Sequence, residues 1–421
     1  MEYLHINGGR ELNGSVNVHG AKNSVLPILA ATLLVDGVCE IKNCPHLSDV
    51  DVTIDILRHL GAVVAFDEDV ITVDSTQITD CRIPEGMMKE LRSSIIFLGA
   101  LAARMGNACL YLPGGCDIGL RPIDLHLKGL QALGYATTTD GNNICAESVS
   151  PRGTEIVLPF PSVGATENII LASVLTPGTT TIINAAREPE IEDLARFLNS
   201  AGARVRGALT TVIQIDGVDS LHSTAHTVIP DRILATTLMS AVAATGGDVF
   251  LNNVSPTQLM PTLPAFQEMG VTVFVGKSTV RTTGNGRLRR VKSIDTRPYP
   301  GFPTDAQAPV MAALTVARGT SVIKENIFEN RFRHVSQLSL FGADITVKDR
   351  IAIVNGVRHL YGTEARCTDL RGGAAVVIAA LIADGESVIR DIGHIDRGYE
   401  NLEYRLSLLD ADVKRICNEE K

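Results

Sequence analysis

One pattern recurs six times along this 421-residue chain and constrains the fold more than any other feature of the sequence. Each copy begins at a glycine, runs through a short apolar strand and a polar loop into an amphipathic helix, and closes at a second glycine or, in the last copy, at Asp410. Successive opening glycines are 69, 72, 69, 72 and 66 residues apart: Gly37, Gly106, Gly178, Gly247, Gly319 and Gly385. Such regular spacing indicates repeated supersecondary units of one kind.

A second helical segment precedes each opening glycine. These segments are mostly apolar and rich in Ala, Leu, Ile and Val, which is typical of helices buried on nearly every side. Two strand-like stretches separated by turn residues follow each closing position. The sequence therefore predicts an α/β fold of six βαβαββ repeats, with buried helices at residues 24–34, 93–104, 165–175, 233–244, 306–317 and 372–383.

The grouping of the repeats follows from the two ends of the sequence. The sixth copy lacks its last strand and the stretch that leads into a buried helix, and segments 3–6 and 14–18 supply both. We therefore predict a first three-repeat domain at residues 22–229 and a second, discontinuous three-repeat domain at residues 1–21 and 230–421. A cleft between two such domains is the default place for a ligand.

Composition narrows the possible partners. The net charge is -9, Trp is absent and aromatic residues make up 4%, so we expect no nucleic-acid binding. The longest apolar stretches, 25–35 and 374–383, are far shorter than the ~20 residues that a membrane-spanning helix needs. We expect a cytoplasmic protein, a monomer or weak oligomer, without membrane insertion. Its eight cysteines show no zinc-like spacing, so we expect reduced thiols, with Cys39 and Cys109 in the core.

Polar and charged residues gather just before the six buried helices. Helix N-termini present unpaired N–H groups and partial positive charge, which suit phosphates and carboxylates. The added cations predict a polyanionic ligand, although each residue could instead cap its helix or form a solvated ion pair. The residues concerned are Lys22, Asn23, Arg92, Ser162, Val163, Gly164, Asp231, Arg232, Asp305, Asp369 and Arg371.

The second copy alone carries an insertion. It spans 28 residues from opening to closing position, against 23 to 25 in the others, and it contains GGCDIGLRP at 114–122. Glycines around Cys116 favour a mobile loop, and the nearby Arg121 should lower the pKa of the thiol. Cys116 is therefore a candidate proton donor or nucleophile; the alternative is a small apolar residue in a turn.

Six segments together carry a family resemblance that covers essentially the whole chain. It resembles the UDP-N-acetylglucosamine 1-carboxyvinyltransferases, enolpyruvyl transferases of peptidoglycan precursor synthesis, whose fold is two inside-out α/β barrels of three repeats each. The segments are GAKNSVLPILAA at 20–31, LPGGCDIGLRPIDLH at 112–126, SVGATEN at 162–168, PGFPTDAQAP at 300–309, IFENRFRHV at 327–335 and HIDRGYE at 394–400.

The resemblance implies a reaction and a set of site residues. The enolpyruvyl group of phosphoenolpyruvate passes to the 3-hydroxyl of UDP-N-acetylglucosamine by addition and elimination, with no metal and no organic cofactor. Cys116 matches the proton donor, which also forms an adduct with the substrate, and Asp305 matches the acceptor of the hydroxyl proton. Lys22, Arg121 and Arg397 match cations around phosphoenolpyruvate.

The remaining implied positions bind substrate. Asn23 is an uncharged partner in the phosphoenolpyruvate site, and Asp369 and Arg371 orient the cations. The residues implied to line the nucleotide-sugar site are Arg92, Arg121, Pro122, Ile123, Asp124, Leu125, Ser162, Val163, Gly164, Asp305 and Ile327. His394 and Asp396 are interpreted as structural support.

The sequence departs from the family pattern at two places, and two alternatives stay open. Phe160 replaces a Lys of some members, and Leu234, Ala235 and Thr236 stand where Glu, a small residue and Gly are expected. One alternative is a non-catalytic paralogue that binds nucleotide sugar. The other is a shikimate 3-phosphate enolpyruvyl transferase, against which the Cys116 segment argues because that enzyme lacks the GGCxIGxRP loop.

Overall fold

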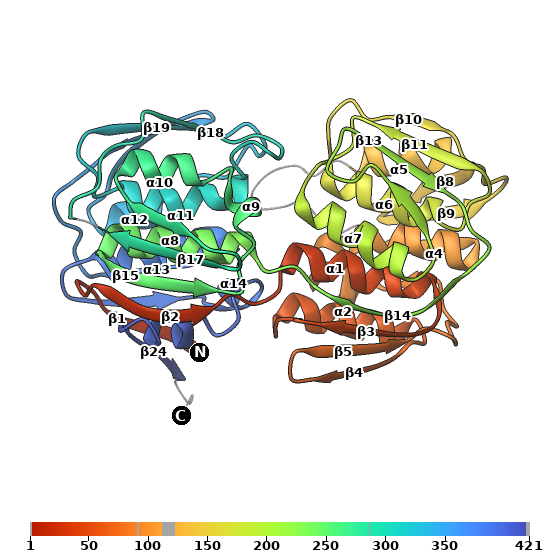
Figure 1. Cartoon of the computed structure of the whole chain (residues 1–421), viewed down its shortest axis with the longest axis horizontal. Coiled ribbons are helices and arrows are strands. Elements are labelled where there is room, and N and C mark those ends of the chain that lie inside the picture. Colours follow the sequence, from red (N-terminus) through yellow and green to blue (C-terminus); the bar gives the residue numbers. More distant parts are fainter. Residues whose placement is uncertain (1, 91, 112–122, 285, 418–421) are drawn as a thin grey trace. The chain divides into compact units, whose positions relative to one another are not determined.

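The computed structural model describes residues 2–90, 92–111, 123–284 and 286–417. The described residues divide into two compact units (Figure 1). The Lys22 unit comprises residues 20–111 and 123–229, and the Asp305 unit comprises residues 2–19 and 230–417. Each unit has its own core of buried apolar side chains. The segment of Cys116, Arg121 and Pro122 lies outside the described residues.

Three four-stranded sheets form within the described part of the Lys22 unit. Apolar and polar side chains alternate along most of their strands, so one face of each sheet joins the core. The strand orders are β14 (Leu221–Thr227), β3 (Val35–Lys42), β5 (Val70–Asp74), β4 (Val63–Asp67); β6 (Arg82–Ile83), β7 (Asn107–Tyr111), β9 (Asn143–Ser148), β8 (Tyr135–Asp140); and β10 (Glu155–Val157), β11 (Thr179–Ile183), β13 (Val212–Asp216), β12 (Arg204–Arg206).

The described part of the Asp305 unit repeats this arrangement. In all six sheets the first two strands are parallel and the other neighbours antiparallel. The strand orders are β2 (Leu12–Asn17), β15 (Gly247–Asn252), β17 (Thr279–Gly284), β16 (Thr272–Val275); β18 (Ser293–Asp295), β19 (Thr320–Lys324), β21 (Ile351–Asn355), β20 (Asp344–Lys348); and β22 (Glu364–Arg366), β23 (Glu386–Arg390), β1 (Glu2–Asn7), β24 (Asp412–Cys417).

The two N-terminal strands enter different sheets, as the red ribbon among green and blue elements shows (Figure 1). Strand β1 completes the sixth sheet between β23 and β24, as the truncated sixth copy predicts. Strand β2 pairs in parallel with β15 and so belongs to the sheet of the fourth copy, not the sixth. In the other unit β14, which follows the third repeat, pairs in parallel with β3 of the first repeat.

The six predicted buried helices are present in the structure. In the Asp305 unit all three pack on one another, and the many Ala residues along them permit close approach. The prediction of a repeated α/β fold is confirmed. The buried helices are α1 (Lys22–Ala31), α4 (Phe97–Met105) after the 3-10 turn η2 (Arg92–Ile96), α6 (Val163–Ser173), α8 (Arg232–Thr245), α11 (Thr304–Leu314) and α13 (Leu370–Ile382).

Further helices pack beside the buried helices, as α2 and α7 do on α1 and α5 does on α6. Their apolar residues recur at helical spacing, and α7 has acidic residues in its first turn, which suits the positive end of the helix dipole. They are α2 (Ser48–His59), α3 (Glu85–Glu90), α5 (Asp124–Ala132), α7 (Pro189–Ser200), α9 (Pro256–Leu259), α10 (Leu263–Met269), α12 (Val335–Leu340), α14 (Gly393–Asp396) and α15 (Leu402–Ser407). Within the described ranges, none of the helices has the length and apolar character required to cross a membrane.

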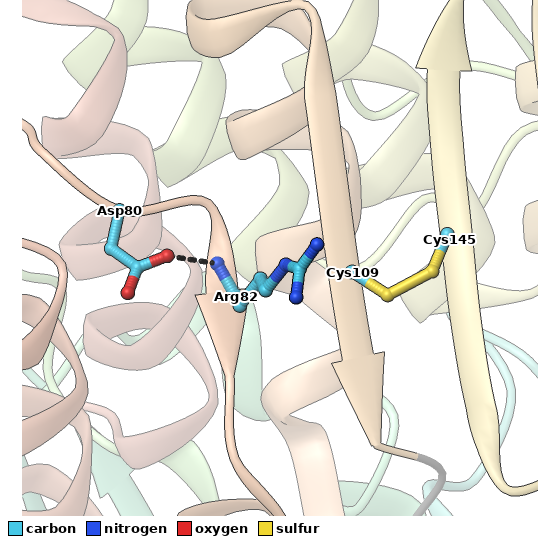
Figure 2. The surroundings of a disulfide bond; sticks show 4 residues. All are labelled: Asp80, Arg82, Cys109 and Cys145. Atoms are coloured by element: carbon cyan, nitrogen blue, oxygen red, sulfur yellow. Dashed lines mark hydrogen bonds between the residues drawn. A yellow bond between two sulfur atoms is a disulfide. The ribbon is translucent and has the colours of Figure 1, made fainter.

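Two cysteines form a disulfide that the sequence analysis did not anticipate. Cys109 and Cys145 are directly opposed on the antiparallel strands β7 and β9, with Cα atoms 4.1 Å apart, and Figure 2 shows the bond beside Arg82. The expectation of reduced thiols is therefore wrong for this pair, because opposed positions bring two side chains into contact. Cys39 is buried as expected, whereas Cys109 is only half-buried and lies outside the core.

Candidate functional site

The start of α1 places Lys22 in a largely buried position. Its Nζ lies 2.7 Å from Oδ2 of Asp49 in the first turn of α2, and both side chains are at most one-tenth exposed. A buried ammonium needs such a partner, since an unpaired charge is costly to remove from water. Asn23, the next residue, is exposed. Asp49 was not predicted as a site residue, although an acidic residue at the N-terminus of an amphipathic helix is a visible signal.

Asp193 of α7 fixes the backbone beside Lys22. Its carboxylate accepts hydrogen bonds from the Ser24 hydroxyl and, at 3.1 Å, from the Ile229 N–H, and it lies 2.9 Å from His226 Nε2. The N–H of Ala21 in turn donates to the carbonyl of Ile229 at 2.7 Å. The start of α1 is thereby held to the end of the segment that follows β14.

Helices α5 and α6 position the other predicted residues of the Lys22 unit. Ser162 caps α6, its Oγ accepting from the Ala165 N–H at 3.4 Å, so Val163 and Gly164 occupy the first turn. Ile123 and Leu125 are half-buried at the start of α5, whereas Asp124 is exposed and pairs with Lys128 at 3.1 Å. Of Arg92, only the backbone within η2 is described.

The Asp305 unit contains a carboxylate held by two buried guanidinium groups. Asp305 lies in the first turn of α11; its Oδ1 accepts from Arg331 Nη2 at 2.7 Å and its Oδ2 from Arg371 Nη2 at 3.1 Å. Both arginine side chains are less than 5% exposed, whereas that of Asp305 is 27% exposed. Both oxygens are therefore fixed in direction while the carboxylate keeps an accessible face. Such an arrangement suits a proton acceptor.

The start of α13 adds a second acidic residue to this cluster. Asp369 caps the helix, its Oδ1 accepting from the N–H groups of Arg371 and Gly372 at 3.1 and 3.0 Å. Burial alone would raise the pKa of Asp369, but Arg331 and the Gly372 N–H hold it below its usual value. Asp369 is thereby a charged cap, which aligns the first turn that carries Arg371.

Arg371 is held on its other side by an aromatic ring. Its guanidinium lies over Tyr399 at 5.2 Å, and the Tyr399 hydroxyl is 3.0 Å from Thr237 Oγ1 of α8. Burial opposes its charge, but Tyr399, Asp305 and Asp231 together raise the pKa of Arg371 above its usual value. The positive charge at this position is therefore permanent.

Ile327 and Arg397, two further predicted residues, lie on connecting segments of the same unit. The Ile327 N–H donates to Glu325 Oε1 at 2.8 Å, and Arg397 follows the short helix α14 and is half-buried. Asp396 accepts two hydrogen bonds from Arg415, at 2.6 and 3.0 Å. The interpretation of Asp396 as structural support agrees with this ion pair.

The departures at the start of α8 are accommodated by the core. Asp231 caps the helix through Ile233 and Leu234, and Leu234 itself is fully buried among apolar side chains. Thr236 donates its hydroxyl to the carbonyl of Arg232 at 2.8 Å. The start of α8 keeps its acidic cap, Asp231. The departures from the family pattern therefore change the buried interior of the helix and not the polarity of its first turn.

Comparison with known proteins identifies the family. The family model described as EPSP synthase (3-phosphoshikimate 1-carboxyvinyltransferase) matches residues 6–406. UDP-N-acetylglucosamine 1-carboxyvinyltransferase 2 of Caldanaerobacter subterraneus subsp. tengcongensis is 50% identical over 99% of this chain and 100% of its own. UDP-N-acetylglucosamine 1-carboxyvinyltransferase 1 of Carboxydothermus hydrogenoformans is 47% identical over all of both chains.

The chain belongs to the UDP-N-acetylglucosamine 1-carboxyvinyltransferase family. Among solved structures, the enolpyruvyl transferase NikO from Streptomyces tendae has 26% identity and a TM-score of 0.90, covering 98% of both chains. An EPSP synthase from Acinetobacter baumannii shares 17% identity with a TM-score of 0.74, covering 99% of this chain and 100% of its own, which indicates the common fold alone. The predicted resemblance and the two-domain enolpyruvyl transferase fold are confirmed.

Within this family framework, the structure brings together part of the predicted site. Asp305, Asp369 and Arg371 form one cluster in the Asp305 unit, and Lys22 with Asn23 begins α1 in the other. Arg331 was missed, although it lies in the quoted segment IFENRFRHV, because nothing in that segment indicates a contact 26 residues back in the sequence. Cys116, Arg121 and Pro122 remain predictions from the sequence, since they lie outside the described residues.

Proposed function

We propose that this protein transfers the enolpyruvyl group of phosphoenolpyruvate to the 3-hydroxyl of UDP-N-acetylglucosamine, with release of phosphate. The observation that carries the proposal is the identity of 46–50% to curated relatives of that name across nearly the whole chain. The identity to an EPSP synthase is only 17%, which leaves the shikimate 3-phosphate alternative with less support. The product would enter peptidoglycan precursor synthesis, and we place the reaction in the cytoplasm.

The reaction requires one proton donor and one proton acceptor. In the addition step, C3 of phosphoenolpyruvate takes a proton, the sugar oxygen forms a bond to C2, and the hydroxyl proton leaves. In the elimination step, C3 loses a proton, the double bond re-forms and phosphate departs with the C–O electron pair. We assign donation to Cys116 and acceptance of the hydroxyl proton to Asp305.

Asp305 supports this assignment through its surroundings. Arg331 and Arg371 each donate to one oxygen of the carboxylate and so hold it in place, while 27% of the Asp305 side chain stays exposed. Lys22 and Arg397, with Arg121, are proposed to bind the phosphate and carboxylate of phosphoenolpyruvate. We propose that these cationic side chains are held in place by Asn23, Asp369 and Arg371. Ser162, Val163 and Gly164 offer the first turn of α6 to the nucleotide sugar.

The test is phosphate release from phosphoenolpyruvate with UDP-N-acetylglucosamine, with shikimate 3-phosphate and with no acceptor. We expect release only with the nucleotide sugar, and its loss in Cys116→Ala. Binding of the nucleotide sugar by the wild type without any phosphate release would instead identify a non-catalytic paralogue. Release with shikimate 3-phosphate would overturn the proposed acceptor.

A second experiment isolates the proton donor. We expect fosfomycin, a small epoxide phosphonate, to alkylate Cys116, and faster when UDP-N-acetylglucosamine is bound. Cys116→Asp should retain transfer and resist the epoxide, because a carboxylic acid still donates a proton but is not trapped in the same way. Full sensitivity of Cys116→Asp to fosfomycin would refute the assignment.

A further inference from the structure

Glu325 is a buried acidic residue that the proposed mechanism does not use. It follows directly on strand β19 and is only 1% exposed. Removal of a carboxylate from water is costly unless hydrogen-bond donors replace the lost hydration. Four donors do so here, three at Oε1 and one at Oε2. Because two of these donors are 21 and 29 residues away in the sequence, the carboxylate joins separate segments of the chain.

The first oxygen, Oε1, holds the segment that contains Ile327. It accepts from the N–H groups of Ile327 and Phe328 at 2.8 and 3.2 Å. The Thr296 hydroxyl donates to the same oxygen at 2.8 Å and itself accepts from the Asn326 N–H at 2.9 Å. Three consecutive N–H groups are thus bound either to this carboxylate or to the hydroxyl beside it. The backbone around Ile327 is therefore fixed largely by one side chain.

The second oxygen, Oε2, holds the start of α11. It accepts from the Thr304 hydroxyl at 2.9 Å, and Thr304 is the residue immediately before Asp305. Further along the chain, Arg331 donates to Asp305 Oδ1 at 2.7 Å. Segment 325–331 is therefore joined to the start of α11 twice, and Ile327 lies in the chain between these two links.

We propose that Glu325 is a positioning residue for the transfer reaction, which holds the proton acceptor Asp305 and the backbone at Ile327 in a fixed relation. The inference rests on the proposed function, in which Asp305 takes the hydroxyl proton and Ile327 contacts the nucleotide sugar. A sugar bound against Ile327 then presents its hydroxyl to a carboxylate that is already in place. Little reorganisation is left for the reaction itself.

The test uses two isosteric substitutions that address the two carboxylate oxygens separately. Thr304→Val removes the donor at Oε2, and Thr296→Val removes one donor at Oε1 together with the acceptor of the Asn326 N–H. Thr304→Ser returns the hydroxyl and is the conservative variant. Thr282→Val is the matched control, because Thr282 is a fully buried threonine of the same unit whose hydroxyl has no hydrogen-bond partner within the described ranges.

Two measurements on each variant separate catalysis from binding. Phosphate release gives kcat, and isothermal titration with UDP-N-acetylglucosamine gives Kd. We expect Thr304→Val to lower kcat about 10- to 100-fold, the effect of a small misplacement of a catalytic group, at unchanged Kd. Thr304→Ser should recover most of the lost kcat. Thr282→Val should match the wild type in both measurements.

Thr296→Val should raise the Kd about 10-fold, as expected if the segment at Ile327 then holds its binding conformation for only a tenth of the time. Glu325→Ala should show both losses, since it removes both oxygens. If Glu325→Ala does not fold, the threonine variants still decide, because they keep the carboxylate and nearly the same side-chain volume.

An unchanged kcat in Thr304→Val would overturn the proposal, and so would a Thr304→Ser variant as slow as Thr304→Val. A rise in Kd for Thr304→Val as large as its fall in kcat would indicate a general disturbance and would also refute it. The titrations need no turnover. A wild type that binds the nucleotide sugar without releasing phosphate would therefore refute the transfer reaction, while the Kd of Thr296→Val would still test the hold on Ile327.

Discussion

At the scale of single residues, Asp305 was predicted from the sequence, but its surroundings were not. A family resemblance identifies a position, whereas the two guanidinium groups that fix the carboxylate come from residues 26 and 66 positions further along. Contacts of that kind depend on how α11 and α13 pack and leave no local pattern. For the same reason Asp49, the partner of Lys22, was not predicted.

Arg331→Met tests the support of Asp305. Methionine keeps much of the apolar volume but removes the hydrogen bond to Oδ1, so the carboxylate can rotate. We expect kcat for transfer to fall about 10- to 100-fold, because a small misplacement of a catalytic group has that effect, while the KM for UDP-N-acetylglucosamine changes less. Arg350→Met, which removes an exposed arginine of the same unit, is the control. An unchanged kcat would show that the hydrogen bond from Arg331 does not position Asp305 for the reaction.

At the scale of helices and strands, the local sequence was sufficient to predict the helices and strands themselves but not all of the strand pairings. All six buried helices were predicted because apolar residues occupy nearly every face of each helix. The pairing of β2 with β15 was not predicted, because its partners, such as Gly14 and Val249, are far apart in the sequence and no local pattern links them. The disulfide was missed for the same reason: the alignment of Cys109 with Cys145 depends on strand register, which the sequence does not state.

The contact between α4 and α6 makes Gly99 sensitive to substitution. A Cβ there would lie 2.3 Å from both the carbonyl oxygen and Oδ1 of Asn168, so α6 would have to move. We expect Gly99→Ala to lower the free energy of unfolding by about 1–3 kcal/mol, as overpacking does, despite the better helix propensity of alanine. Gly86→Ala, with nothing within 4 Å, should be neutral or stabilising by up to ~1 kcal/mol. Urea unfolding measures the free energy of unfolding of both variants. Equal values for Gly99→Ala and Gly86→Ala would contradict the packing argument.

The junction between α1 and α7 depends on Asp193. Asp193→Ala removes the carboxylate oxygen that accepts from the Ser24 hydroxyl and from the Ile229 N–H. We expect a loss of about 1–3 kcal/mol in unfolding free energy and a raised KM for phosphoenolpyruvate, since Lys22 begins the same helix. Asp248→Asn removes a surface ion pair with Arg281 and should leave the stability nearly unchanged. A KM for phosphoenolpyruvate equal to that of the wild type would show that Asp193 does not influence the substrate site.

At the scale of the whole molecule, buried titratable groups make stability depend on pH. Burial lowers the pKa of His126 and of His334 to about 4, whereas burial and the neighbouring Glu190 and Glu188 raise that of Glu167. On acidification the unfolded chain protonates the two histidines first, which destabilises the fold. Glu167 has the opposite effect, because the folded state binds its proton first.

Between pH 6.5 and 4.5 the two histidines therefore lower the free energy of unfolding as pH falls, by up to about 1.4 kcal/mol per pH unit for each proton. Glu167 offsets part of this loss, because burial raises the pKa of its carboxyl in the folded state. Glu167→Gln removes the opposing group and should make the slope steeper. Urea unfolding at several pH values measures both proteins; a slope unaffected by Glu167→Gln would contradict the assignment of Glu167 as protonated.

The interleaving of the N-terminal strands has a consequence for biosynthesis. The hydrogen bond between Cys417 and Glu2 spans 415 residues, so β1 leaves the ribosome long before its partner strand β24 has been made. During translation the Lys22 unit can complete its three sheets while β1, with Leu4 and Ile6 destined for the core, has no sheet to join. An unpaired apolar strand of this kind is a target for chaperones and for aggregation. Slow translation of the sixth repeat would prolong the time for which β1 stays unpaired, and this affects the Asp305 unit alone.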